Sequence, residues 1–119
     1  MKTKERGYFK LETPEGVKYA HFSRTFIAQL QKHTGKDLVT WGQELTEMES
    51  EVAQFDALTD VLYAGMISFC LEEDLEQNFN LYKVGNWLWE AMNEGTDVAD
   101  ELFQTLQAAL PKSKEVQGS

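Results

Sequence analysis

The chain has 119 residues, 42% of them hydrophobic, and a formal net charge of −9. This length fits one ordinary domain with its own core, and the single cysteine, Cys70, excludes an internal disulfide and favours a reducing environment. The longest uncharged apolar stretch, residues 61–71, is too short for the roughly 20 residues of a membrane-spanning helix. No apolar segment follows the basic N-terminus, as a signal peptide requires. We therefore expect a cytoplasmic protein without a membrane partner.

The charges are distributed unevenly along the chain. Residues 1–36 carry eight Lys or Arg and three Glu, a net +5, whereas residues 37–110 carry one Lys and sixteen Asp or Glu, a net −15. This asymmetry favours electrostatic pairing, either between the two parts of one fold or between copies in a homo-oligomer. Because so acidic a surface repels a phosphate backbone, we expect no nucleic acid partner.

Residues 7–22 have the alternation of a β-hairpin. Phe9 and Leu11 alternate with polar residues in the first half, and Val17 and Tyr19 are expected to occupy the apolar face of the second. The segment Thr13-Pro14-Glu15-Gly16 fits a type I turn, with Pro at its second position and Gly at its last. Since a lone hairpin is marginally stable, helices must cover its apolar face.

Helical periodicity predicts five helices after the hairpin, over residues 24–34, 37–45, 47–72, 81–92 and 97–110. Ser23 and Asn80 are predicted N-caps, and Thr46 with Glu49 has the spacing of a capping box for the third helix. That helix is apolar nearly all round in its second half, as expected of a helix packed on several sides. Its Gly65 costs about 0.5 to 1 kcal/mol relative to Ala, which the close approach of a neighbouring helix would offset.

These elements predict an α+β, mainly α fold, in which an N-terminal β-hairpin is followed by a compact bundle of four to five helices. We expect a single domain over residues 1–110 and a flexible tail over residues 111–119, because the tail is polar and follows Pro111.

Catalytic, cofactor and metal sites have no clear signature in the sequence. His21 and His33 lie twelve residues apart and lack the spacing of a metal pair. Residues 74–85 resemble a calcium loop, but Phe79 replaces its turn glycine and Gly85 replaces its final glutamate. Phosphate-binding glycine motifs and nucleophile motifs do not occur. We therefore expect a non-enzymatic protein without a cofactor or a metal.

The predicted helix 81–92 carries the candidate partner-binding residues. Tyr82 and Trp89, seven residues apart, project together to one side of the apolar stripe that should face the core. Exposed Tyr and Trp side chains are enriched at interface hot spots, so these two are candidates for partner binding, with Trp41 as a third. The alternative is that the second or fifth helix covers the two rings within the monomer.

The order of the elements resembles that of the tail assembly chaperones of long-tailed phages and prophages. The resemblance covers roughly residues 50–111 and rests on the central helix "FDALTDVLYAGMISFC", an acidic break, and the helices "LYKVGNWLWEAM" and "ELFQTLQAALP". It implies a non-enzymatic protein of the host cytoplasm that keeps the tape measure protein soluble and helps tail tube subunits assemble around it.

Two other classes of function stay open. An acidic adaptor or DNA mimic would inhibit or bridge another protein, but a mimic needs carboxylates spaced like phosphates over one face, and much of the acid here lies at helix ends and loops. An enzyme or small-ligand domain would need a deep pocket with converging polar groups.

Overall fold

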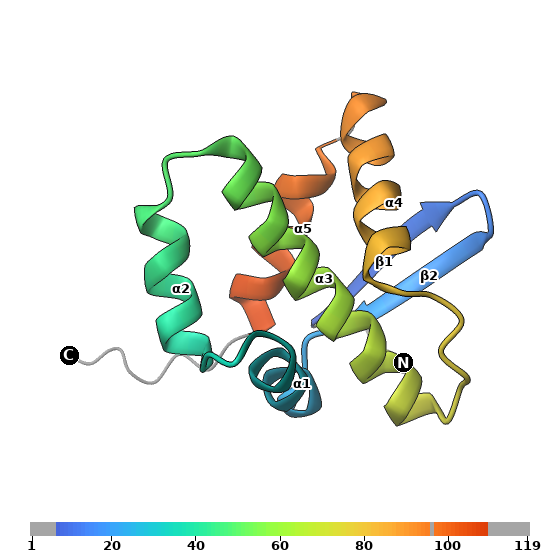
Figure 1. Cartoon of the computed structure of the whole chain (residues 1–119). Helices are drawn as coiled ribbons and strands as arrows, with labels where there is room; N and C mark the ends of the chain where they lie inside the picture. The colour runs from blue at the N-terminus through green and yellow to red at the C-terminus, as the bar shows by residue number, and fades with distance from the viewer. Residues whose placement is uncertain (1–6, 96, 110–119) are drawn as a thin grey trace.

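The computed structural model describes residues 7–95 and 97–109, and within them a hairpin precedes five helices (Figure 1). The elements are β1 (Tyr8–Thr13), β2 (Gly16–His21), α1 (Arg24–Thr34), α2 (Leu38–Glu47), α3 (Glu51–Glu73), α4 (Leu81–Asn93) and α5 (Val98–Ala109). The predicted α+β, mainly α architecture is confirmed. The predicted tail, residues 111–119, lies outside the described residues. In the part of the chain described, no helix has the length and hydropathy needed to cross a bilayer.

The hairpin has the predicted strands, but the predicted face of β2 is wrong. The two strands are antiparallel, and a two-residue loop places Thr13 opposite Gly16 and Phe9 opposite Ala20. Directly paired residues share a face, so Ala20 joins Phe9 in the core while Val17 and Tyr19 lie on the other side. Val17 is 47% exposed and Tyr19 is 43% exposed. The turn length fixes this register, and the alternation in β2 alone did not reveal it.

Helix α3 is the axis of the core, as its all-round apolar sequence predicted. It packs against α1, β2, α4 and α5, and it crosses the middle of the molecule in Figure 1. Helix α5 packs in turn against α4 and β1. Buried residues of α3 include Val61, Leu62, Ala64 and Met66.

The start of α3 differs from the prediction. Ser50 is its N-cap, and the Ser50 hydroxyl accepts a hydrogen bond from the backbone N–H of Ala53 at 3.3 Å. Thr46 does not cap α3, because α2 continues to Glu47 and the Thr46 hydroxyl donates back to the carbonyl of Gln43 at 2.8 Å. The longer α2 therefore removes the predicted capping box.

Gly65 is needed for close packing, but its neighbour is the end of the hairpin and not a helix as predicted. A Cβ at Gly65 would lie 2.5 Å from Cε1 of Phe22 and 3.0 Å from Cβ of Ala20. Because glycine has no side chain, α3 can cross the hairpin at short distance at this position.

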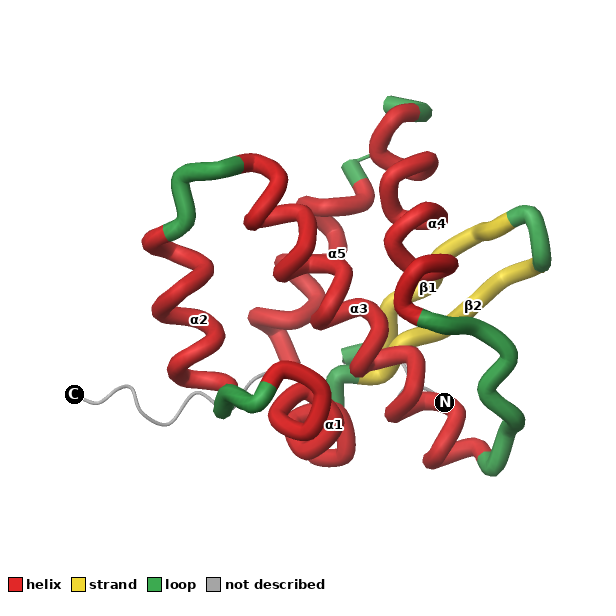
Figure 2. The backbone as a smooth tube through the Cα atoms, viewed as in Figure 1, coloured by secondary structure: helices red, strands yellow, loops and turns green. Residues whose placement is uncertain are grey.

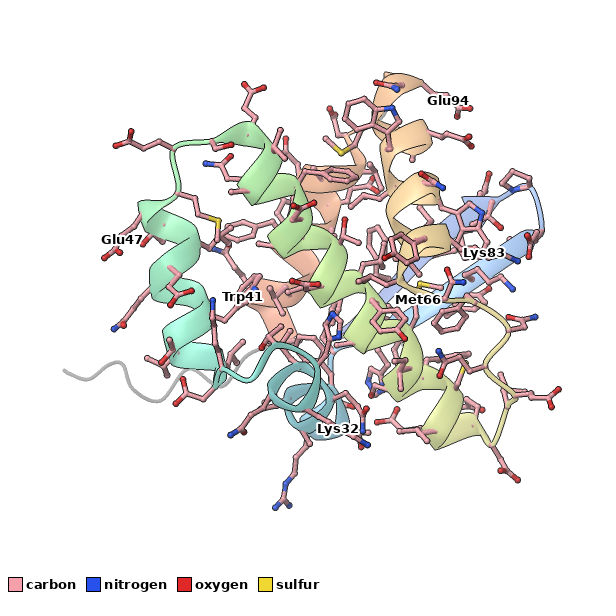
Figure 3. All side chains as sticks on the ribbon, in the orientation of Figure 1. Lys32, Trp41, Glu47, Met66, Lys83 and Glu94 are labelled. Atoms are coloured by element: carbon pink, nitrogen blue, oxygen red, sulfur yellow. The ribbon has the colours of Figure 1, made fainter. Side chains whose placement is uncertain are left out.

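Helix α2 lies at one edge of the molecule, between the loops that join it to α1 and α3 (Figure 2). Trp41 is its buried residue, with 6% of its surface exposed. Figure 3 places Trp41 on the side of α2 that faces α3. This large side chain, together with the partly buried Leu38 and Leu45, packs α2 against the core.

Candidate functional site

Two of the three candidate partner-binding residues lie on the surface of α4. Tyr82 is 81% exposed and Trp89 is 54% exposed, so neither ring is covered by the second or fifth helix. Trp41 has a different environment, because it is buried in the core beneath α2. Its indole Nε1 has no hydrogen-bond partner among the described residues. Trp41 therefore contributes to the packing of this fold, and its part in partner binding stays a prediction.

A hollow of about 630 Å³ lies beside the two exposed rings, between α3 and α4. We call it the α3–α4 groove; its lining residues are Phe55, Asp56, Thr59, Asp60, Leu81, Tyr82, Gly85, Asn86 and Trp89. Across it, the rings of Phe55 and Trp89 meet edge to face, with their centroids 5.5 Å apart. The groove therefore combines aromatic walls with two carboxylates from α3.

Gly85 explains why the groove is open between the two rings. It follows Tyr82 by one helical turn and precedes Trp89 by another, so all three lie on the same side of α4. A Cβ at Gly85 would lie 3.5 Å from Cγ2 of Thr59, an ordinary contact distance. The missing side chain thus leaves space at the floor of the groove where α4 approaches α3.

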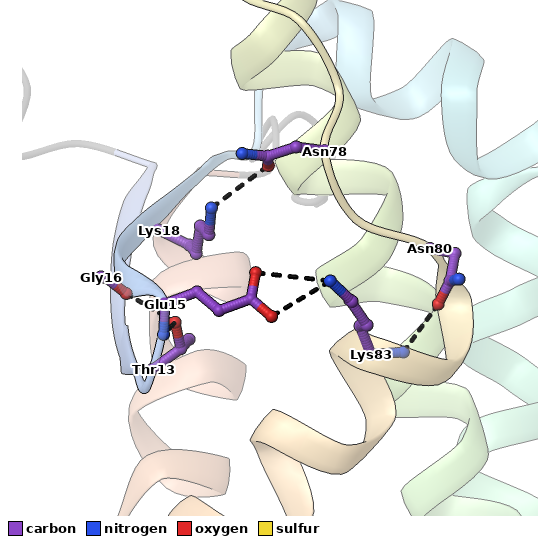
Figure 4. A network of polar contacts seen from close by, with 7 residues as sticks. All are labelled: Thr13, Glu15, Gly16, Lys18, Asn78, Asn80 and Lys83. Atoms are coloured by element: carbon purple, nitrogen blue, oxygen red, sulfur yellow. Dashed lines mark hydrogen bonds and ion pairs between the residues drawn. The ribbon is translucent and has the colours of Figure 1, made fainter.

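The opposite side and the start of α4 hold these residues in place. Val84, Trp87 and Leu88 are buried, which turns the side with Tyr82 and Trp89 outward. At its N-terminus, Asn80 Oδ1 accepts a hydrogen bond from the backbone N–H of Lys83 at 2.8 Å, as the predicted N-cap requires (Figure 4).

The hairpin also contacts the first turn of α4. The Lys83 ammonium lies 3.0 Å from Glu15 Oε2 at the hairpin turn, and Lys18 donates to Asn78 Oδ1 at 3.2 Å (Figure 4). An exposed pair of this kind contributes about 1 kcal/mol or less to stability. Its main effect is on geometry, because it ties the hairpin turn to the helix that carries the exposed rings.

A second hollow, of about 460 Å³, lies on the other side of the same α3 carboxylates. We call it the α2–α3 groove; its lining includes Trp41 and Glu44 of α2, Met48 directly after α2, and His33 and Lys36. The two grooves share Asp56, Asp60 and Leu81. Asp56 and Asp60 therefore form a ridge of negative charge between two adjoining hollows.

Most charged groups of the two grooves are already paired. His33 Nε2 lies 2.8 Å from Asp60 Oδ1, and Lys36 forms an ion pair with Glu44. The Asp56 carboxylate differs, because it has no hydrogen-bond or ion-pair partner among residues 7–95 and 97–109. Neither Phe55 nor Asp56 was predicted as part of a site, since their place in the chain is far from α4.

A polar cluster that the sequence did not indicate joins the end of β2 to the end of α3. His21 Nδ1 lies 2.5 Å from Glu72 Oε1, the Ser23 hydroxyl donates to Glu72 Oε2, and the Ser68 hydroxyl lies 3.0 Å from that of Ser23. Tyr8 stacks on the His21 ring at 3.9 Å. The carboxylate lies between the serine and the histidine, so the imidazole does not contact Ser23 as a catalytic base would. This cluster links two structural elements.

The cluster changes the ionisation of its carboxyl group. Partial burial by itself raises the pKa of Glu72, but the hydrogen bonds from Ser23 and His21 and the charge of His21 outweigh it. The pKa of Glu72 therefore lies below its ordinary value.

Cys70 is a free, partly buried thiol of α3. Partial burial raises the pKa of the Cys70 thiol, against an opposing effect of the Lys18 charge, which reduces the fraction of reactive thiolate. Within the described ranges, no three His, Cys, Asp or Glu side chains are grouped so that they could hold a metal ion.

Comparison with family models, with curated proteins and with solved structures found no match.

Proposed function

We propose that the chain is a phage tail assembly chaperone, a non-enzymatic protein that binds the tape measure protein and tail tube subunits in the host cytoplasm. The observation that carries this proposal is the exposed pair Tyr82 and Trp89 beside the α3–α4 groove. Large aromatic side chains next to a hollow are typical of the residues that dominate protein interfaces. Their place on a helix with a buried opposite side gives them a rigid support.

The shape of the groove favours a protein partner over a small molecule. A small ligand is usually enclosed on most sides by its site, whereas Tyr82 at the groove wall is 81% exposed. An open hollow between two helices suits a third helix, whose apolar residues at spacings of three and four enter it in turn. The resemblance to tail assembly chaperones supports the tape measure protein, with its long helices, as that partner.

Charge supports the same function in a second way. A chaperone that covers apolar segments of another protein must keep the complex in solution, and like charges on its surface oppose aggregation. The net charge of −15 over residues 37–110 provides this repulsion.

Co-expression tests the proposal. The chain is produced together with the tape measure protein and the tail tube protein of the same genome, and the soluble fraction is purified through a tag on the chain. We expect the tape measure protein to be soluble and to co-purify, and we expect Tyr82→Ala combined with Trp89→Ala to reduce the recovered amount.

Tyr19→Ala is the matched control, because Tyr19 is an exposed tyrosine on the hairpin and does not line the α3–α4 groove. This variant should recover as much tape measure protein as the unchanged chain. An unchanged chain that leaves both tail proteins insoluble and unbound would contradict the proposal.

A further inference from the structure

We infer that the α3–α4 groove binds a cationic amphipathic helix, and that Asp56 pairs with a Lys or Arg side chain of that helix. This inference rests on the proposed binding function of the groove and specifies the chemistry of its partner.

The position of Asp56 is the first observation. Asp56 lines both the α3–α4 groove and the α2–α3 groove, so its carboxylate lies on the ridge between them. It is exposed, and its neighbour on the groove wall is Phe55, whose ring contacts Trp89. A helix lying in the α3–α4 groove would therefore have this carboxylate at its edge.

The state of the nearby cations is the second observation. His33 and Lys36, which line the α2–α3 groove, already contact Asp60 and Glu44. Lys83, the only Lys or Arg of α4, is paired with Glu15 of the hairpin. No described cation that lines either groove pairs with Asp56, so a cation of a bound helix would reach this carboxylate without displacing an existing ion pair.

The surroundings of Asp56 fit an amphipathic helix. Val52 lies one turn before Asp56 on the same side of α3 and is 70% exposed, and Trp89 is 54% exposed across the groove. Apolar residues of the partner would contact these side chains, while the stem of a Lys or Arg would cross the rings and bring its charge to Asp56. The acidic half of the chain would speed association with such a helix.

The test uses three designed helical peptides of one length with leucines at identical positions. Their flanking positions carry Lys in the first peptide, Gln in the second and Glu in the third. Each peptide is titrated calorimetrically into the full chain. We expect the Lys peptide to bind most tightly, the Gln peptide to bind more weakly and the Glu peptide not to bind measurably.

Two variants with the same change in charge separate pairing at Asp56 from the general attraction of an acidic protein. Asp56→Asn should weaken binding of the Lys peptide by about 1.5- to fivefold, the range of an exposed ion pair, and leave binding of the Gln peptide unchanged. Glu73→Gln changes another exposed carboxylate of α3 that lines neither groove, and it should leave both peptides unaffected. Thermal melts of both variants should match the unchanged chain.

The inference is overturned if the Lys and Gln peptides bind equally, if no peptide binds, or if Asp56→Asn and Glu73→Gln weaken binding alike. Its failure is distinguishable from that of the chaperone function. If peptide binding depends on Asp56 but the tape measure protein does not co-purify, the inference is supported and the proposed chaperone function is contradicted. If the tape measure protein co-purifies equally well with the Asp56→Asn variant, the chaperone function is supported and the pairing at Asp56 is contradicted.

Discussion

The rings of Phe55 and Trp89 meet edge to face across the α3–α4 groove, with centroids 5.5 Å apart and planes at 88°. This contact holds one side of the Trp89 indole while 54% of the residue stays exposed. Tyr82 is 81% exposed and makes no ring contact with the described residues. Because a side chain that is already held loses less conformational entropy on binding, Trp89 should be the stronger anchor.

Trp89→Ala is therefore expected to weaken partner binding by about 2 kcal/mol or more, as at other interface hot spots, and more than Tyr82→Ala does. Tyr82→Ala should change the free energy of unfolding by less than about 0.5 kcal/mol, because its ring is almost fully exposed. Trp89→Ala should cost about 1 kcal/mol of stability through the lost contact with Phe55. Calorimetric titration measures partner binding and thermal melts measure stability. A large fall in melting temperature for Tyr82→Ala would contradict the placement of Tyr82 on the binding surface.

Trp41→Ala is expected to reduce stability more than partner binding, because Trp41 is 6% exposed and anchors α2. Removing so large a buried ring should lower the free energy of unfolding by about 3 to 5 kcal/mol. Trp41→Phe should cost much less, since it keeps an aromatic ring and removes an Nε1–H that has no described partner. Denaturant unfolding distinguishes the variants. If Trp41→Ala keeps its full stability but loses partner binding, Trp41 is a partner-binding residue and not an anchor of α2.

The two glycines in the helices that form the groove should respond oppositely to substitution by alanine. Gly65→Ala would place a Cβ 2.5 Å from the Phe22 ring and should destabilise the chain by about 1 to 3 kcal/mol. Gly85→Ala meets only an ordinary contact of 3.5 Å with Thr59, so its higher helix propensity should add about 0.5 to 1 kcal/mol. Urea titrations of both variants measure the difference, and equal destabilisation would mean that α4 lies closer to α3 than described.

The Glu72 cluster should make stability depend on pH in the acid range. The pKa of Glu72 is lower in the folded chain than its ordinary value of about 4.3, so the folded state holds this proton more weakly than the unfolded state does. The resulting stability is fully present above pH about 5 and is lost as the pH falls through the folded pKa.

Glu72→Gln should remove that contribution. Unfolding free energies of the two chains, measured by denaturant between pH 7 and pH 3, should therefore differ most at pH 7 and converge towards pH 3. Two curves that stay parallel over the whole range would show that Glu72 is not the responsible group.

Most of the fold follows from local signals in the sequence. The turn at Pro14 and Glu15, the Asn80 cap and the apolar sequence around Met66 each specify their element within a few residues. The start of α3 was placed too early, because Thr46 and Ser50 both suit a cap and only the actual length of α2 decides between them.

Only the α4 side of the groove could be predicted from the sequence. The helical period of α4 put Tyr82 and Trp89 on one side, but Phe55 and Asp56 reach them through the crossing of α3 and α4, which periodicity does not specify. The burial of Trp41 does follow from its own helix, because Leu38, Trp41 and Leu45 recur at spacings of three and four and pack together against the core.

The most direct test of the groove as a binding site is to map where the proposed partner contacts the chain. An isotope-labelled chain is titrated with a helical fragment of a tape measure protein encoded in the same genome, and amide and indole resonances are followed by NMR. We predict that the shifts concentrate at Asp56, Gly85 and the Trp89 indole N–H, with Tyr19 on the hairpin unchanged. Shifts that concentrate on the hairpin, or a spectrum unaffected by the fragment, would contradict the proposed site.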